Sequence, residues 1–326
     1  MYDYFMKKMI YQKFILGVND KDNLLQALQR GLGGVIFFTK DIQNEDQFKN
    51  LVLGIKNKAL IPPFLSIDQE GGRVERTENI RPKRLSARYA FEKGEKFLKE
   101  QAEEISSELN NWGLNLNFAP CVDVNTNPDN PIIGERAFAN NPYDVIKGEE
   151  IFIEASRKNC IIPCVKHFPG HGDADKDSHL TLPKIDLSLE EMEKVHIKPF
   201  KEAIKNDIEM IMVAHLHCTC FDKEENLPTS LSANAVGYLR NTLGYRGVVI
   251  TDDMVMKGVQ DFGSLEACIM AIKAGVDMFI FRNSDEDTIK LIEDLLLAVE
   301  KDDELKTKII ESNERILKLK KRYGIL

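Results

Sequence analysis

Apolar and polar positions follow two rhythms along the chain. Short, nearly unbroken runs of Val, Ile, Phe and Leu are separated by longer stretches in which apolar residues recur at helical spacing. Unbroken apolar runs are typical of parallel strands that are covered on both faces. They predict eight strands, at 9–18, 34–39, 62–68, 114–122, 161–168, 209–216, 247–252 and 277–282. The stretches between them predict helices at 96–112, 143–158, 188–206, 232–243, 264–274 and 286–300.

This order of elements predicts the fold. Eight strands with helices between them predict a (β/α)8 TIM-like barrel, and a length of 326 residues suits that fold. An open doubly wound sheet is the alternative, but no G-x-G-x-x-G motif follows the first strand. Because we find no internal repeat and no interdomain linker, we expect one catalytic domain over 1–326. A Lys- and Glu-rich stretch at about 303–322 predicts a closing C-terminal helix, and Ser188 with Glu191 predicts a capping box.

Composition narrows the class of protein. A net charge of −8 argues against binding to nucleic acid or to an anionic membrane, where a basic face is expected. No apolar run approaches the roughly 20 residues that span a bilayer. The N-terminal segment MYDYFMKKMIYQKFILG lacks an unbroken apolar region and a small-residue cleavage site, so we predict no secretory signal. We therefore expect a cytoplasmic protein.

The six cysteines indicate reduced thiols rather than a disulfide framework, because no export signal is predicted. Cys218 and Cys220 form a C-x-C motif, a spacing that occurs in metal and redox pairs. No second pair of ligands lies nearby, which argues against a metal site. Apolar surroundings predict core positions for Cys121, Cys160, Cys164 and Cys268.

In a barrel of this kind, the chemistry lies at the C-terminal ends of the strands. Polar side chains that stand at or just after five of the predicted strand ends are Asp68, Asp123, Lys166, His167, His215, Asp252 and Asp253. Their convergence on one rim suits a sugar site, because carboxylate, Lys and Arg side chains hold hydroxyl groups in charge-assisted hydrogen bonds.

The most informative stretch is KHFPGHGDADKDSH at 166–179, which leaves a strand, turns at Pro and Gly, and enters a polar loop. One interpretation is metal binding. The D-x-D-x-D run is not a calcium loop, because Ser178 and Lys184 stand where that loop has Gly and Glu. Spacing leaves open a zinc site on the histidines of this stretch, which are His167, His171 and His179. A second interpretation is a packed polar loop.

The third interpretation is an acid/base loop. Asp177 and His179 are two residues apart, close enough for the carboxylate to orient the imidazole and to stabilise its protonated form. The neighbouring glycines would let the loop carry both side chains over a bound substrate.

Four ordered segments resemble one family. The run KHFPGHG followed by DSH resembles the signature of the β-N-acetylglucosaminidases (β-hexosaminidases) of glycoside hydrolase family 3, in their single-domain form. IDQEGGRVERT at 67–77 is similar to the family's sugar-binding turn, and IGERAF at 133–138 is similar to its arginine-bearing loop. TDDM at 251–254 resembles its nucleophile strand end. The resemblance extends over residues 30–285.

The resemblance implies a retaining mechanism and a set of roles. Asp252 would attack the anomeric carbon, and His179 would act as acid and base with Asp177 as its partner. We expect no cofactor, and no metal either, because the D-x-D-x-D run fails the calcium-loop pattern and His179 is better used as a proton carrier. Asp253 is expected to be structural. The residues expected to bind the sugar are Asp68, Arg76, Arg136, Lys166 and His167, and those expected to hold loops through ion pairs are Glu70, Arg73 and Glu135.

A histidine acid departs from the usual pair of carboxylates in glycosidases. It is chemically sensible, because the ordinary pKa of histidine, about 6.5, lies near neutral pH. Related β-glucosidases take this acid from a second domain, and the residues after 282 are too few for one. The acid is therefore expected within the barrel.

The implied activity is removal of terminal β-linked N-acetylglucosamine, with carbohydrates such as muropeptides from peptidoglycan turnover as substrates. A neutral histidine repels anions less than a carboxylate does, so a β-N-acetylglucosaminide phosphorylase is an alternative. A broad-specificity β-glucosidase of the same fold is another. A non-catalytic sugar-binding or metal-binding barrel is the third. Sequence does not decide the oligomeric state.

Overall fold

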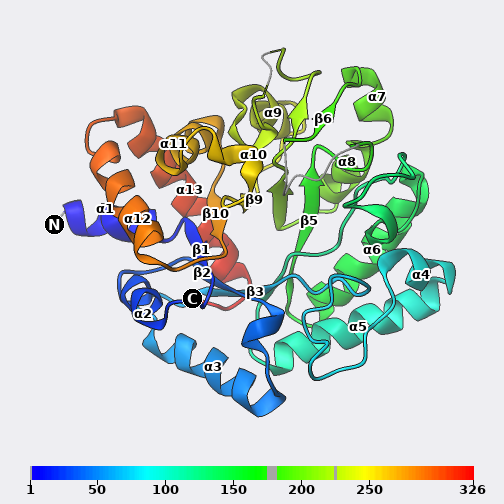
Figure 1. The fold of residues 1–326 in the computed structure, drawn as a ribbon, viewed down its shortest axis with the longest axis horizontal. Coiled ribbons are helices and arrows are strands. Elements are labelled where there is room, and N and C mark those ends of the chain that lie inside the picture. The colour runs from blue at the N-terminus through cyan, green and yellow to red at the C-terminus, as the bar shows by residue number, and fades with distance from the viewer. Residues whose placement is uncertain (1, 175–181, 224–225) are drawn as a thin grey trace.

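The computed structural model describes residues 2–174, 182–223 and 226–326, with side chains from Tyr4 onward. Eight parallel strands close a barrel in the order β1-β10-β9-β7-β5-β4-β3-β2, and helices surround it (Figure 1). The predicted (β/α)8 TIM-like barrel is confirmed. The barrel strands are β1 (Phe14–Leu16), β2 (Gly34–Phe37), β3 (Phe64–Ile67), β4 (Leu116–Asn117), β5 (Ile162–Phe168), β7 (Met210–Val213), β9 (Val248–Asp253) and β10 (Met278–Phe281).

Helices connect successive strands and cover the outside of the barrel. The longer ones are α1 (Tyr2–Tyr11), α2 (Lys21–Gln29), α3 (Glu45–Lys58), α5 (Glu95–Asn111), α6 (Pro142–Lys158), α8 (Lys198–Lys205), α11 (Ser264–Ala274), α12 (Glu286–Val299) and α13 (Asp303–Arg322). Shorter ones are α4 (Ala87–Glu92), α7 (Leu189–Lys194), α9 (Ala233–Gly237), α10 (Lys257–Gln260), η1 (Thr39–Asp41), η2 (Gly134–Arg136), η3 (Thr229–Leu231) and η4 (Tyr238–Thr242). Within the described ranges, no helix is long and apolar enough to cross a membrane.

Alternating side chains of the strands build two apolar layers, as the period of two in a strand requires. Inward-facing residues such as Ile36, Phe64 and Met210 fill the barrel itself. Outward-facing residues such as Val35 and Leu65 pack against the helices. The barrel is thus a solid core, and it presents polar chemistry at its ends.

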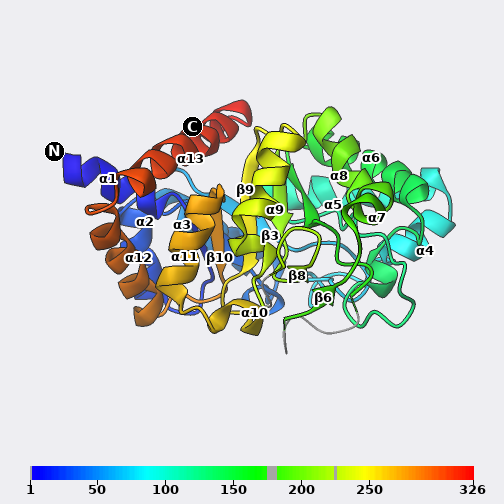
Figure 2. The ribbon, with the colours of Figure 1, turned by 90° about the horizontal axis from the view of Figure 1, so that it is seen from above.

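Helix α13 covers the N-terminal end of the strands. Its Ile316 and Leu319 join the apolar interior of the barrel. Lys320 is fully buried beside them and donates a hydrogen bond from Nζ to Gln12 Oε1 at 2.8 Å. Figure 2 shows α13 at one end of the barrel and a small two-stranded sheet, β6 (Lys184–Ile185) with β8 (His217–Cys218), at the other.

Three details of the predicted elements were wrong. The stretch at 9–18 is not one strand, because its first residues end α1, where Ile10 is buried as part of a helix face. The stretch at 188–206 forms two helices rather than one, because Pro199 lies in the first turn of α8 and starts a new helix. Cys160 is exposed, since it stands in a turn with φ of 57° just after α6.

Two smaller predictions agree with the structure. The capping box is present, because Ser188 Oγ accepts from Glu191 N at 3.3 Å and Glu191 Oε2 accepts from Ser188 N at 2.8 Å. The other cysteines that were predicted in the core, Cys121, Cys164 and Cys268, are buried.

Candidate active site

The C-terminal ends of three strands bring the predicted residues together at one rim. Asp68 follows β3 directly, Lys166 and His167 lie near the end of β5, and Asp252 lies near the end of β9. The Lys166–His167 peptide bond is cis. One strand separates β3 from β5, and one separates β5 from β9, so their polar ends face a common space.

Lys166 is the centre of the ion pairs at this rim. Its Nζ lies 2.8 Å from Asp68 Oδ1 and 2.5 Å from Glu70 Oε1, and the Lys166 side chain is 2% exposed. Burial lowers the pKa of Lys166, but Asp68 and Glu70 outweigh burial and raise that pKa above its ordinary value. A buried ammonium of this kind stays charged because two carboxylates compensate it.

Arg136 closes the network from the loop after β4. Its Nε and Nη2 donate to the two oxygens of Glu70 at 2.9 and 2.8 Å, a bidentate pair. Burial raises the pKa of Glu70, but Arg136 and Lys166 hold that pKa well below its usual range. On the other side, Arg76 Nη2 lies 3.7 Å from Asp68 Oδ2. The loops after β3 and β4 are thereby fixed to the end of β5.

Asp123 fixes the orientation of His167. Its Oδ2 lies 2.7 Å from His167 Nδ1, and its Oδ1 accepts from the backbone N of His167 at 3.3 Å and of His171 at 2.6 Å. Burial raises the pKa of Asp123, but the two histidines outweigh it, so the carboxyl is ionised. A carboxylate can only accept, which places the proton of a neutral His167 ring on Nδ1.

The other nitrogen of His167 agrees with this tautomer. His167 Nε2 lies 3.4 Å from Arg136 Nη2, and a guanidinium can only donate. The Nε2 lone pair therefore faces Arg136. The network thus sets three cationic side chains, Lys166, Arg136 and Arg76, against three carboxylates, Asp68, Glu70 and Asp123.

Asp252 adds a further carboxylate to this rim. Its Oδ1 accepts from Asp253 N at 2.7 Å, and among the described residues no other hydrogen bond reaches its carboxylate. Burial raises the pKa of Asp252, but His167, His215 and the Asp253 N–H outweigh burial and hold the pKa below its ordinary value. The structure thus holds an ionised carboxylate with one oxygen, Oδ2, to which no described group donates, and a nucleophile needs such an oxygen.

Asp253 differs from its neighbour. Its carboxylate accepts from Arg282 Nε, from Arg282 N at 3.3 Å and from Val255 N at 3.1 Å. These contacts tie the loop after β9 to the end of β10, and they leave the carboxylate fully engaged. The expected structural role of Asp253 fits this geometry.

Two further histidines lie close to the network. His215 Nδ1 lies 2.7 Å from Ser230 Oγ, while its buried Nε2 has no partner among the described residues. Burial lowers the pKa of His215. His171 is also buried, with neither ring nitrogen bonded to a described residue, and burial lowers its pKa to about 4. The pKa of each ring thus lies below its ordinary value.

The predicted acid/base pair, Asp177 and His179, lies outside the described residues. The described chain approaches it from both sides. On the near side, Asp173 Oδ1 accepts from Thr126 Oγ1 at 2.8 Å. On the far side, the backbone resumes at residue 182 and enters β6.

One group of side chains has the composition of a metal site. Cys121, Asp123 and His167 offer ligand atoms within 4.8 Å of one another. These atoms already bond to each other, since Cys121 Sγ donates to Asp123 Oδ2 at 3.2 Å and His167 Nδ1 donates to the same oxygen. Burial raises the pKa of the Cys121 thiol well above its ordinary value, which opposes the thiolate that zinc requires. The group is better described as a hydrogen-bonded cluster around Asp123.

Sequence reasoning underrated two residues of this rim. Glu70 was expected only to hold a loop, yet it bridges Lys166 and Arg136 at the centre of the network. Asp123 was noted at a strand end but given no role. Its position after an apolar run was the available signal. Arg73, expected in an ion pair, donates to Pro131 O at 2.9 Å instead.

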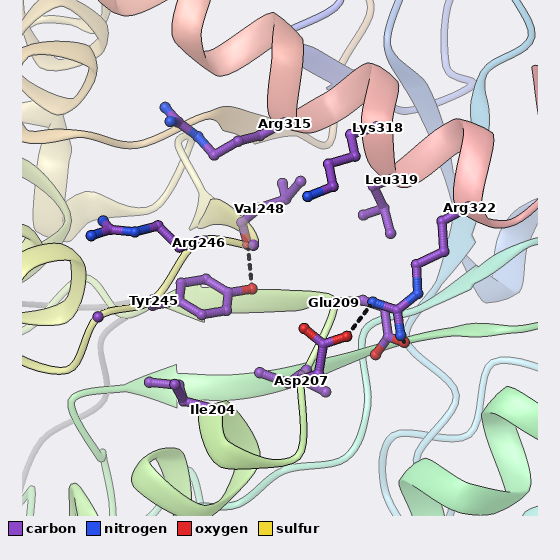
Figure 3. A pocket seen from close by; sticks show the side chains of 13 residues that line it. Ile204, Asp207, Glu209, Tyr245, Arg246, Val248, Arg315, Lys318, Leu319 and Arg322 are labelled. Atoms are coloured by element: carbon purple, nitrogen blue, oxygen red, sulfur yellow. Dashed lines mark hydrogen bonds and ion pairs between the residues drawn. The ribbon is translucent and has the colours of Figure 1, made fainter.

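A cavity of about 220 Å³ lies at the opposite end of the barrel, beside α13 (Figure 3). There Tyr245 Oη donates to Val248 O at 3.1 Å, and Arg322 Nη1 lies 2.8 Å from Asp207 Oδ2. The buried Glu209 pairs with Arg322 Nη2 at 3.1 Å. The two pairs of Arg322 join α13 to the loop before β7, and the bond of Tyr245 closes the turn before β9. The cavity shares no residue with the rim network, and its charges serve packing of the helix.

Comparison with known proteins gives one family model and several named relatives. The model of the glycosyl hydrolase family 3 N-terminal domain matches residues 7–319. Beta-hexosaminidase A from Pseudoalteromonas piscicida is 35% identical over 269 residues, which are 76% of this chain and 45% of that protein. A beta-hexosaminidase from Photobacterium profundum is 34% identical over 270 residues, which are 81% of this chain and 78% of that protein.

A similar solved structure is that of a glycoside hydrolase family 3 beta-N-acetylglucosaminidase from Paenibacillus sp. str. FPU-7. It is 32% identical and superposes with a TM-score of 0.90 over 98% of this chain and 62% of that chain. This chain therefore spans less than two thirds of the length of several of its relatives.

Proposed function

The chain belongs to glycosyl hydrolase family 3, and from that premise we propose that it is a retaining exo-β-N-acetylhexosaminidase. It would remove terminal, non-reducing β-linked N-acetylglucosamine. Both relatives described above carry the name beta-hexosaminidase. We further propose that the barrel performs this reaction as a single domain without a cofactor or metal, in the cytoplasm, on fragments of cell-wall glycan.

The observation that carries the proposal is the carboxylate of Asp252, whose Oδ2 has no hydrogen-bond partner among the described residues. The carboxylates of Asp68, Glu70 and Asp123 are engaged by Lys166, Arg136 and His167, whereas Asp252 makes no ion pair with a described residue. A glycosidase transition state develops positive charge at the anomeric carbon. Asp252 is thus positioned to stabilise that charge and then to form the bond.

The reaction would proceed in two displacements. Asp252 Oδ2, which no described N–H occupies, attacks the anomeric carbon as the leaving oxygen departs. The product is a covalent glycosyl-enzyme with inverted configuration. Water then attacks the same carbon from the opposite side and releases the sugar with its original configuration.

His179, with Asp177 as its partner, is the proposed acid and base. A histidine is favoured because the rim carboxylates are acceptors in ion pairs and have no proton to give. Glu70 illustrates this, since Arg136 and Lys166 hold its pKa well below its usual range. His215 is the second candidate, because it lies close to Asp252 and its buried Nε2 has no partner among the described residues.

The ion-pair network would bind the sugar. Asp68 is 17% exposed and Arg76 is 29% exposed, so both can meet hydroxyl groups without leaving the network. The side chains of Lys166, His167 and Arg136 are less exposed than those of Asp68 and Arg76. Because their mutual contacts fix them before the sugar arrives, binding loses little side-chain entropy.

An activity screen tests the proposal. The purified chain is incubated with aryl β-N-acetylglucosaminide, β-N-acetylgalactosaminide, β-glucoside and β-xyloside, and with the Asp252→Asn variant as the matched control. We expect the N-acetylglucosaminide to be preferred and the variant to be inactive. Equal rates on the β-glucoside would favour the broad-specificity alternative, and activity that survives in the variant would remove Asp252 from the mechanism.

Phosphorolysis is tested in the same assay. Hydrolysis predicts free N-acetylglucosamine as the product in the presence or absence of phosphate. Formation of N-acetylglucosamine 1-phosphate at a rate above that of hydrolysis would make the protein a phosphorylase instead.

A further inference from the structure

Two cysteines of the C-x-C motif face each other outside the catalytic network. Cys218 lies in β8 and Cys220 lies in the turn that follows, with their Sγ atoms 3.3 Å apart. Cys218 is buried, and Cys220 is partly exposed. Among the described residues, no other two cysteines are bonded to each other, so this pair is distinct in the chain.

The contact between the two thiols shifts their pKa values in opposite directions. The hydrogen bond from Cys218 lowers the pKa of Cys220, and the same bond raises the pKa of Cys218. The thiolate therefore forms first on the sulfur that solvent can reach, which is the arrangement of a reactive cysteine with a resolving partner. A disulfide bond of about 2.05 Å requires the two sulfurs to approach by about 1.2 Å.

We propose that Cys218 and Cys220 form a dithiol–disulfide site that reacts with small-molecule disulfides and alters catalysis at the adjacent rim. In the first step, the Cys220 thiolate attacks one sulfur of the small disulfide, and the other sulfur leaves as a thiolate. In the second step, the thiol of Cys218 loses its proton and attacks Cys220 Sγ, which expels the second small thiol. The protein loses two electrons and two protons, and one small disulfide becomes two thiols.

The residue between the cysteines connects this site to β6 and the residue that follows it. Thr219 N donates to Ile185 O at 3.1 Å, and Thr219 Oγ1 donates to Asp186 Oδ1 at 2.7 Å. Strand β8 also pairs with β6 through Ile185 and Cys218 (Figure 2). In the sequence, β6 follows the stretch that contains Asp177 and His179 by a few residues.

Closing the disulfide would restrict the backbone of Thr219 and shift its two donors. The contacts that hold the chain just after the proposed acid would then weaken. We therefore expect the oxidised protein to be less active than the reduced protein. This inference goes beyond the proposed glycosidase activity, because bond formation between the two sulfurs does not depend on any sugar.

Thiol mapping tests the site itself. The reduced chain is incubated with oxidised glutathione, free thiols are alkylated, and peptides are analysed by mass spectrometry. We expect the peptide with Cys218 and Cys220 to lose two hydrogen atoms and to escape alkylation. The Cys160→Ser variant, which removes an exposed thiol outside the pair, should react in the same way. Alkylation of both cysteines after oxidation, or a stable glutathione adduct on Cys220, would overturn the proposal.

Activity tests the connection to the rim. On the aryl N-acetylglucosaminide, kcat of the oxidised wild type should fall by roughly tenfold, a factor equal to about 1.4 kcal/mol in the barrier, and dithiothreitol should restore it. Cys220→Ser should keep the reduced activity and lose the response. An unchanged kcat in fully oxidised protein would refute the effect on catalysis. If the disulfide forms in a protein that hydrolyses none of the glycosides, the proposed function fails while the redox site stands.

Discussion

Replacing Asp123 by Asn tests whether this buried carboxylate positions His167. The substitution keeps the shape of the side chain, and the remaining oxygen can still accept from the backbone N–H groups of His167 and His171. The new amide would, however, point hydrogens at His167 Nδ1, which now lies 2.7 Å from Asp123 Oδ2. The ring must then move its proton to Nε2, where it meets the N–H groups of Arg136.

The expected magnitude follows from the one charge-assisted hydrogen bond that is lost. Such a bond contributes about 1.5–3 kcal/mol, which corresponds to about 10- to 150-fold in kcat/KM if it acts fully in the transition state. The assay is kcat/KM on an aryl β-N-acetylglucosaminide, measured below the unfolding transition of the variant. Asp22→Asn, at an exposed position in α2, is the matched control and should have wild-type kinetics.

A double-mutant cycle separates positioning from general damage. If Asp123 acts through His167, Asp123→Asn should have little further effect in a His167→Ala background, because the interaction is already gone. The same loss in both backgrounds would refute the role of Asp123 in orienting the ring. If Asp123→Asn keeps the wild-type kcat/KM, activity does not depend on a His167 ring that is protonated on Nδ1.

Three further predictions follow. His179→Ala should slow glycosylation by about 10²–10⁴-fold when the leaving group is a sugar, and far less when it is an aryl group of low pKa. Asp177→Ala should show the same pattern with smaller losses. Equal losses for sugar and aryl leaving groups would point to His215 as the acid. Exhaustive chelation should leave kcat/KM unchanged, and a loss that one ion restores would contradict this. Burial lowers the pKa of Lys320 to about 7 in the folded protein, so above that pH the side chain takes up a proton when the protein unfolds. The free energy of unfolding should therefore rise with pH, by up to about 1.4 kcal/mol per pH unit. Lys320→Met should remove this gain between pH 7 and 8.5 in urea unfolding, and an unchanged slope would show that Lys320 is charged when folded.

The apolar pattern was enough to predict the barrel, because each buried strand is a run of residues that must avoid water on both faces. The apolar pattern did not show that a helix, α1, ends just before β1. Met9 and Ile10 are apolar in either element, and a helix that packs on α12 and α13 buries them as well as a strand would. The break between α7 and α8 was visible in Pro199, which was not given enough weight.

The strand-end rule was enough to bring Asp68, Lys166 and Asp252 to one rim, since their position depends on the fold alone. Partners that come from loops were harder. Glu70 and Arg136 are 66 positions apart in the sequence, and their bidentate contact depends on how two loops fold over the barrel end. The pairing of Asp123 with His167 depends on the same kind of loop geometry, which periodicity does not encode.

Trapping the covalent intermediate tests the central claim most directly. A fluorinated N-acetylglucosamine analogue with a good leaving group should form a glycosyl-enzyme faster than water releases it, and the labelled peptide can be identified by mass spectrometry. The account predicts that the sugar is attached to Asp252, because no described group donates to one of its oxygens, while Asp253 is held by Arg282 and the backbone. A label on Asp253 or on any glutamate would contradict the account.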